Sequence, residues 1–142
     1  MSRIPRDLEY LKTGFNAEAA SAARFRAYAA RAERDGQPNL AKHWAELARD
    51  KDALAIRQLD AAEDKRPNLT DVAAAIAEEL YENDVLYAKL IAGSGPEAAS
   101  VFKDVVAEQR KHLDRLESLR EGITGAPKDA PAELRKPVTA RG

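Results

Sequence analysis

The chain has 142 residues, of which 33% are charged, with a formal net charge of -1 and no cysteine. This length is typical of a single domain. The near-neutral charge argues against a nucleic-acid partner, which a basic excess would favour. The lack of cysteine excludes disulfides, zinc–thiolate sites and iron–sulfur clusters. Alanine accounts for 29 residues and aromatic residues for 6%, a composition typical of helical bundles, so the sequence predicts an all-α protein.

The sequence shows neither a secretory signal nor a membrane span. Residues 1–10 are rich in charge and lack the apolar stretch of a signal peptide. The longest strictly apolar run, residues 72–77, is far shorter than the ~20 residues needed to cross a bilayer. We therefore expect a soluble cytoplasmic protein without a membrane partner.

Prolines and glycines divide the chain into four predicted helices. The punctuating residues are Pro5, Pro38, Pro67 and Pro96, with Gly36, Gly93 and Gly95 just before two of them. Proline is favoured at the first position of a helix, and glycine just after its end. The predicted helices span residues 5–34, 38–63, 69–92 and 96–121. Because the links between them are short, neighbouring helices should be antiparallel, which predicts an antiparallel four-helix bundle over residues 1–121.

The composition changes after residue 121. Residues 122–142 contain three prolines and three glycines and carry a net charge of +2. We expect this segment to be a tail without a core of its own, which is either disordered or docked on the bundle, on a neighbouring subunit or on another partner.

Heptad spacing assigns an inward-facing line of side chains to each predicted helix. Each line is apolar at both ends and polar in the middle, which predicts a polar layer across the middle of the bundle. The lines are Leu8, Leu11, Phe15, Glu18, Ala22, Phe25 and Ala29; Leu40, Trp44, Leu47, Lys51, Leu54, Gln58 and Ala61; Val72, Ile76, Glu79, Glu82 or Asn83, Leu86 and Leu90; and Phe102, Val105, Gln109, His112, Leu116 and Leu119.

The two halves of the chain also resemble each other weakly. Glu18 corresponds to Glu79 and Phe25 to Leu86 at an offset of 61, and Trp44 corresponds to Phe102 and Lys51 to Gln109 at an offset of 58. The pattern indicates a bundle built from two similar helical hairpins.

Carboxylates on an inward line must be paired, protonated or bound to a metal ion. Helical bundles hold di-metal sites with one Glu from each of two helices and a Glu-x-x-His pair from each of the other two. The spacing of three residues places both members of such a pair on one helix face. The candidate metal ligands of this kind are Glu18, Glu79, Glu82 and His112.

Several segments resemble the ferritin-like domain of the rubrerythrin family. Residues 15–18 are similar to the family's first-helix ligand segment, and residues 75–82 to its third-helix segment, in which Glu79 and Glu82 match two Glu ligands. Tyr87 matches a tyrosine that the family often places beside the metals, and Phe25 takes the equivalent place in the first predicted helix. The resemblance covers residues 8–120 and implies a ferritin-like bundle with iron chemistry, without the cysteine-ligated rubredoxin-like domain of rubrerythrins.

The ligand set is incomplete when compared with that family. The second-helix Glu-x-x-His position reads Lys51 to Leu54, so both ligands are missing. The fourth-helix position reads Gln109 to His112, so only the histidine remains. A full di-iron centre is therefore not expected, and we predict either no metal or one weakly held iron or manganese ion. Lys51 should supply positive charge in place of the metal and should contact at least one of the three candidate glutamates.

The sequence leaves two classes of function open. In the one we favour, a rubrerythrin-related protein with an eroded di-metal site acts as a homodimeric scaffold or binding protein. In the alternative, the protein binds iron or manganese and acts as a non-haem peroxidase or oxidase in oxidative-stress defence. Two structural alternatives accompany these classes: exchange of helices between two chains through the link at residues 64–68, and use of the tail as a docking address.

Overall fold

The computed structural model describes residues 5–63, 65–125 and 129–134, and it is helical. Its elements are α1 (Pro5–Arg34), α2 (Pro38–Ala62), α3 (Asn68–Tyr81), the π-helical turn η1 (Glu82–Leu86), α4 (Tyr87–Ala92) and α5 (Pro96–Gly125). No strand occurs in these described ranges. The predicted all-α class is confirmed, and so are the four predicted helices, because α3, η1 and α4 together form the third.

The helix boundaries largely follow the prolines and glycines. Helix α1 ends in a glycine-dependent motif in which Gly36 adopts a φ of 75°. The amide of Gln37 donates to the Ala32 carbonyl at 2.8 Å, and the amide of Gly36 donates to the Glu33 carbonyl at 3.1 Å. These two bonds form the arrangement that commonly closes a helix through a left-handed glycine.

Helix α5 differs from the prediction. It continues to Gly125, four residues beyond the predicted end at residue 121, so the first turn of the predicted tail is helical. A glycine inside a helix is tolerated at a cost of about 1 kcal/mol, and Gly122 does not end α5. Of the remaining tail, residues 129–134 are described, while 126–128 and 135–142 lie outside the described residues.

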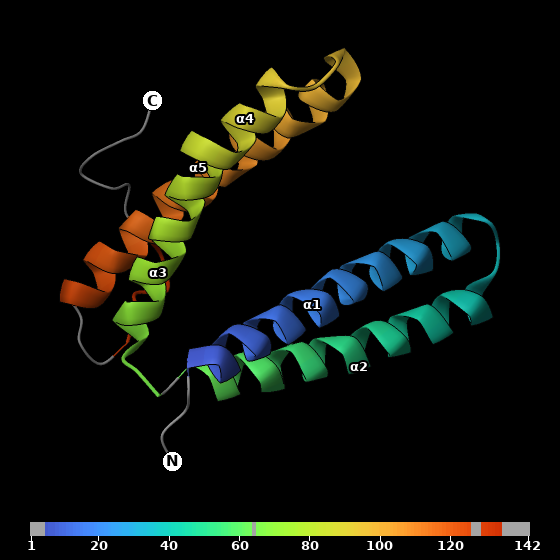
Figure 1. The fold of residues 1–142 in the computed structure, drawn as a ribbon, viewed down its shortest axis with the longest axis horizontal. Coiled ribbons are helices and arrows are strands. Elements are labelled where there is room, and N and C mark those ends of the chain that lie inside the picture. The colour runs from blue at the N-terminus through green and yellow to red at the C-terminus, as the bar shows by residue number, and fades with distance from the viewer. Residues whose placement is uncertain (1–4, 64, 126–128, 135–142) are drawn as a thin grey trace. The chain divides into compact units, whose positions relative to one another are not determined.

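The chain divides into two compact units, Met1–Lys65 and Arg66–Gly142. Each contains an antiparallel helical hairpin (Figure 1). In the N-terminal hairpin α1 packs along α2, and in the C-terminal hairpin α3, η1 and α4 pack along α5. In the described ranges, none of the helices has the length and apolarity needed to cross a membrane.

A line of alanines on α2 forms the seam of the N-terminal hairpin, meaning the line of residues that faces α1. The buried alanines recur every seven residues and are Ala41, Ala48, Ala55 and Ala62, which are 2% to 7% exposed. On α1, Ala22 is fully buried. The partly buried residues Trp44, Lys51 and Gln58 complete the seam. Because side-chain size sets the distance between packed helices, this alanine line lets α1 and α2 approach closely.

The predicted inward line of α2 is only partly the line that faces α1. Leu40, Leu47 and Leu54 are 42%, 45% and 48% exposed, and we call this exposed leucine line the free flank of α2. The prediction placed the largest apolar side chains inward, whereas the hairpin buries the adjacent alanines. The alanine line and the leucine line of α2 both flank the same polar positions. Residue spacing alone therefore does not show which of the two lines faces α1.

The C-terminal hairpin repeats this seam at the predicted offset of 58. Ala99 and Leu113, at 9% and 2% exposed, are the counterparts of Ala41 and Ala55. The partly buried Phe102 and Gln109 are the counterparts of Trp44 and Lys51. The weak sequence repeat is therefore a repeat of helix packing.

The π turn η1 shifts the repeat by one residue. Its hydrogen bonds join residues five apart, so it contains one residue more than an α-helical turn. Beyond it, the Tyr87 ring lies 6.0 Å from the Phe102 ring, as the Phe25 ring lies 5.2 Å from the Trp44 ring. Tyr87 is therefore the counterpart of Phe25, and the predicted match of Phe25 with Leu86 is wrong by one residue.

The alanine seam predicts a selective effect of larger side chains on α2. Ala48→Leu should lower the free energy of unfolding by about 1–3 kcal/mol, because the added atoms must force α1 and α2 apart. Ala53→Leu, on the exposed opposite side of α2, should change it by less than about 0.5 kcal/mol. Urea unfolding followed by circular dichroism measures both values, and equal effects of the two substitutions would contradict the seam.

Candidate functional site

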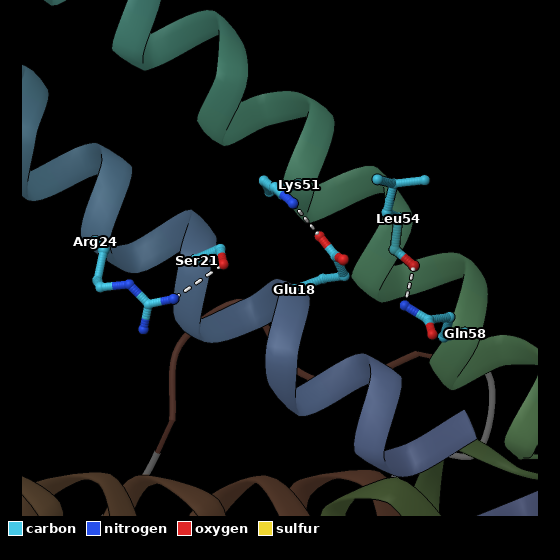
Figure 2. Close-up of polar contacts among 6 residues, drawn as sticks. All are labelled: Glu18, Ser21, Arg24, Lys51, Leu54 and Gln58. Carbon is cyan, nitrogen blue, oxygen red and sulfur yellow. Dashed lines mark hydrogen bonds and ion pairs between the residues drawn. The ribbon is translucent and has the colours of Figure 1, made fainter. Parts of the chain in front are cut away.

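An ion pair lies on the seam of the N-terminal hairpin. Lys51 Nζ of α2 is 2.9 Å from Glu18 Oε2 of α1 (Figure 2). The two side chains are 32% and 25% exposed, so both charges are partly withdrawn from water. The predicted contact between Lys51 and one of the candidate glutamates is confirmed, while its role in place of a metal remains a prediction.

The geometry of this pair leaves hydrogen-bonding capacity unused. Among the described residues Glu18 Oε2 is buried without an aligned hydrogen-bond donor, although the Lys51 ammonium is close to it. An ammonium group carries three N–H donors. Lys51 can therefore hold Glu18 by charge and still donate to a further acceptor.

Gln58 lies on the same seam, two turns further along α2, and its amide covers Gly14 of α1. A Cβ atom at Gly14 would lie 1.7 Å from Gln58 Oε1. Gln58 Nε2 donates to the carbonyl oxygen of Leu54 at 3.2 Å, as Figure 2 shows. Gly14 has no role in the sequence-based prediction, although an isolated glycine inside a helical pattern is a signal that the sequence contains.

Aromatic rings fill the seam on the other side of Lys51, toward the turn that joins α1 and α2. The Trp44 ring lies 5.2 Å from that of Phe25 and 5.1 Å from that of Tyr28. The Arg31 guanidinium lies 5.6 Å from the centre of the Tyr28 ring. These contacts are within the range of favourable aromatic and cation–π interactions, and they make this part of the seam apolar.

A second polar contact lies at the equivalent place in the C-terminal hairpin. Gln109 Nε2 of α5 donates to Glu82 Oε2 at 3.3 Å. Gln109 is the counterpart of Lys51, and Glu82 is the first residue of η1. Single π turns inside α-helices occur frequently at functional sites, and sequence spacing did not predict this one.

Several buried polar atoms around this contact lack hydrogen-bond partners in the described part of the chain. They are Glu79 Oε2, Asn83 Oδ1 and Nδ2, and Gln109 Oε1. Buried polar groups are normally hydrogen-bonded, and an unsatisfied one costs about 1–3 kcal/mol. The three oxygens are therefore available to water, or to a donor or cation from outside the hairpin, and Asn83 Nδ2 is available to an acceptor.

Negative charge is in excess around Glu82 in the C-terminal hairpin. Burial raises the pKa of Glu82 above its ordinary value, and the carboxylates of Glu78 and Glu79 raise it further. The hydrogen bond from Gln109 lowers the pKa, but its effect is the smallest of these. The surroundings of Glu82 thus favour protonation of its carboxylate or the binding of a cation beside it.

His112 lies away from the seam of its hairpin. It is exposed on α5, at the position equivalent to Leu54 on the free flank of α2. Its charge contributes to lowering the pKa of Glu108, after the larger effects of the hydrogen bond and charge of Lys111. His112 therefore belongs to the corresponding free flank of α5.

The four candidate ligands are divided between the two units. Glu18 belongs to the N-terminal unit, and Glu79, Glu82 and His112 belong to the C-terminal unit. Within the described ranges no three Asp, Glu or His side chains are grouped in a way that could hold a metal ion. Among the described residues, neither unit by itself therefore groups the candidate ligands into such a site.

No protein-family model matches this chain, and a search of characterised proteins finds no significant relative. The resemblance to rubrerythrins therefore rests on the sequence motifs themselves.

The raised pKa of Glu82 predicts a pH-dependent gain on neutralising this side chain. A carboxyl group with a raised pKa in the folded state stabilises the fold below its ordinary pKa, and this contribution is lost as the pH rises through the raised value. Glu82→Gln should therefore raise Tm by a few degrees at pH 7, and the gain should disappear below about pH 4.

Glu108→Gln is the matched control for Glu82→Gln. The pKa of the exposed Glu108 is lowered by its contact with Lys111, so this substitution should lower Tm slightly at pH 7. Thermal unfolding between pH 3 and pH 8 measures both effects. A loss of stability at pH 7 in Glu82→Gln would contradict the charge imbalance.

Proposed function

We propose that this chain is a ferritin-like helical protein in which the Lys51 ammonium takes the place of a metal cation, and that it acts as a scaffold or binding protein and not as an efficient oxidase. The observation that carries the proposal is the 2.9 Å contact between Lys51 Nζ and Glu18 Oε2. Glu18 is the first-helix position that resembles a metal-ligand segment, and its carboxylate is already neutralised by a side chain of the protein.

Electrostatics supports this assignment. Carboxylates held close together raise one another's pKa, and a cation at the site reverses that effect. Lys51 supplies such a cation on the N-terminal hairpin. The Lys51 ammonium would repel a divalent ion bound beside Glu18. Lys51 therefore opposes metal binding at this site while it supplies the positive charge that a metal ion would otherwise provide.

The proposed four-helix bundle brings the free flanks of two hairpins together. Lys51 and Gln109 each stand thirteen residues after the first residue of their helices, which places both about 20 Å from the helix start. Because Lys51 and Gln109 lie at equal distances from the starts of their helices, the Lys51–Glu18 and Gln109–Glu82 contacts would lie in one layer of the proposed bundle. The exposed leucines of α2 would then be covered together with Leu86 and Leu90, each 36% exposed in its own hairpin.

One observation favours the alternative of an iron- or manganese-binding peroxidase or oxidase. Glu79 Oε2, Asn83 Oδ1 and Gln109 Oε1 are buried oxygens without hydrogen-bond partners in the described ranges. Oxygen ligands suit manganese, so a metal held by the C-terminal hairpin would satisfy them. Two irons per chain with peroxide turnover, measured by elemental analysis and assay of untagged protein, would establish this alternative and refute the eroded-site proposal.

A double-mutant cycle tests the replacement of metal by Lys51. Lys51→Met should lower the free energy of unfolding at pH 7 by about 1–2 kcal/mol, because it strands the Glu18 charge in a partly buried place. Glu18→Gln in the same background should restore part of the loss. Urea unfolding of the wild type, both single variants and the double variant measures the coupling.

Lys42→Met is the control for this cycle, because Lys42 is exposed on the same helix. It should change the free energy of unfolding by less than about 0.5 kcal/mol. Purely additive effects of Lys51→Met and Glu18→Gln would refute the charge replacement.

Restoring the missing ligands should create metal affinity. The triple variant Lys51→Glu, Leu54→His and Gln109→Glu completes both Glu-x-x-His pairs expected of a di-metal bundle. We expect it to bind iron or manganese in isothermal titration calorimetry. The double variant Leu54→His and Gln109→Glu keeps the Lys51 ammonium and should bind at least tenfold more weakly. Failure of the triple variant to bind either metal would show that these positions are not equivalent to the ligand positions.

A further inference from the structure

We infer that residues 129–134 form a strap that docks on α5 of the same chain at Gly122 and covers the neighbouring Ser118. The strap and the helix to which it docks both belong to the C-terminal unit. The inference goes beyond the proposed function and does not depend on it, because the Lys51–Glu18 pair belongs to the N-terminal unit.

The contact between Gly122 and Pro131 carries the inference. A Cβ atom at Gly122 would lie 2.8 Å from both Cγ and Cδ of Pro131, a distance that real Cβ atoms essentially never show. A glycine inside a helix costs about 1 kcal/mol relative to alanine, and glycine is used where another part of the chain approaches the backbone closely. Gly122 lies within α5, before its last residue Gly125. Its missing side chain leaves room for the proline ring.

The strap has half-buried apolar side chains on both sides of this contact. They are Ala130 and Leu134, whereas Asp129 and residues 131–133 are exposed. The amide of Ala130 donates to Asp129 Oδ1 at 2.7 Å, and the ring of Pro131 fixes its own φ. The backbone of the strap is therefore restrained where it meets α5, which lowers the conformational entropy lost on docking.

The repeat between the two hairpins provides an internal comparison for the end of α5. At the offset of 58, Ser118 corresponds to Asp60 of α2, and Arg120 corresponds to Ala62. Asp60 is exposed and Ala62 is buried, whereas Ser118 is 6% exposed and Arg120 is exposed. The buried side of the helix is therefore displaced toward Ser118 in the C-terminal hairpin.

The side of α5 that gains burial is the side that meets the strap. Ser118 and Gly122 are four residues apart and share one face of the helix. A strap docked at Gly122 therefore accounts for the burial of Ser118. While the strap is docked, a partner that binds residues 129–134 must compete with α5 for them, so the contact limits the use of this segment as a docking address.

Disulfide trapping tests the contact between Gly122 and Pro131. The chain has no cysteine, so a pair of introduced cysteines reports a single contact. A disulfide requires Cβ atoms about 3.5–4.5 Å apart. The full chain with Gly122→Cys and Pro131→Cys should form a disulfide within one chain in glutathione buffer. Its equilibrium constant should be about tenfold larger than that of a control pair that is not held together.

The control pair is Gly125→Cys with Pro131→Cys. A Cβ atom at Gly125 would have no neighbour within 4 Å, although Gly125 is closer to Pro131 in the sequence than Gly122 is. Preferential trapping of the Gly122 pair therefore reports docking and not proximity along the chain. Non-reducing electrophoresis and mass spectrometry measure the disulfides of both pairs.

Thiol labelling tests whether the strap covers Ser118. Ser118→Cys should react slowly with N-ethylmaleimide, and its rate should rise about tenfold when Gly122→Leu displaces the proline ring. Pro131→Gly removes the ring without changing α5 and should have the same effect. Ser100→Cys, at an exposed position of the same helix, should be labelled equally fast with and without these changes. Circular dichroism checks that the helix content is retained.

Three results would overturn the inference. They are equal trapping of the two cysteine pairs, a disulfide that joins two chains, and a labelling rate of Ser118→Cys that either strap variant leaves unchanged. None of these results bears on the coupling between Lys51 and Glu18, so failure of the strap is distinguishable from failure of the proposed function.

Discussion

The close packing of α1 against the alanine line of α2 determines where the polar groups of the N-terminal hairpin lie. Small side chains bring the two helices together, so each larger seam residue of α2 must lie across the face of α1. Trp44 contacts Phe25 there, Lys51 contacts Glu18, and the amide of Gln58 occupies the space left by Gly14. The apolar, ionic and amide contacts of this hairpin are thus consequences of one seam.

The equivalent seam of the C-terminal hairpin has a different polar side chain at the position of Lys51. Gln109 replaces Lys51, and a neutral amide can donate a hydrogen bond but cannot neutralise a carboxylate. Burial and the carboxylates of Glu78 and Glu79 therefore keep the pKa of Glu82 raised even though Gln109 contacts it. One hairpin has a cation with unused donors and the other has carboxylates with unused acceptors. The two otherwise similar hairpins therefore differ in the charge that they carry at equivalent positions of the seam.

The π turn is the main structural departure from the repeat. Glu79 lies before the π turn and still corresponds to Glu18 of the first hairpin. Because the turn adds one residue, each later residue of this helix is displaced by one position relative to its expected counterpart in α1. Tyr87 then packs against Phe102, while Leu86 is left 36% exposed. The turn also begins at Glu82, so the shift in register starts at one of the candidate ligands.

The sequence by itself determined the features that depend on local interactions. Proline and glycine positions predicted the starts of the four helices and the ends of the first three to within one residue, because capping and backbone restrictions act within one turn. Spacing also predicted the repeat and the partly buried Glu18 and Lys51. Only the tertiary structure decided which of two adjacent lines on α2 faces α1, where the π turn falls and which glutamate contacts Lys51. Periodicity specifies a helix face to within about one residue, whereas these features depend on how closely a second helix, distant in sequence, approaches that face.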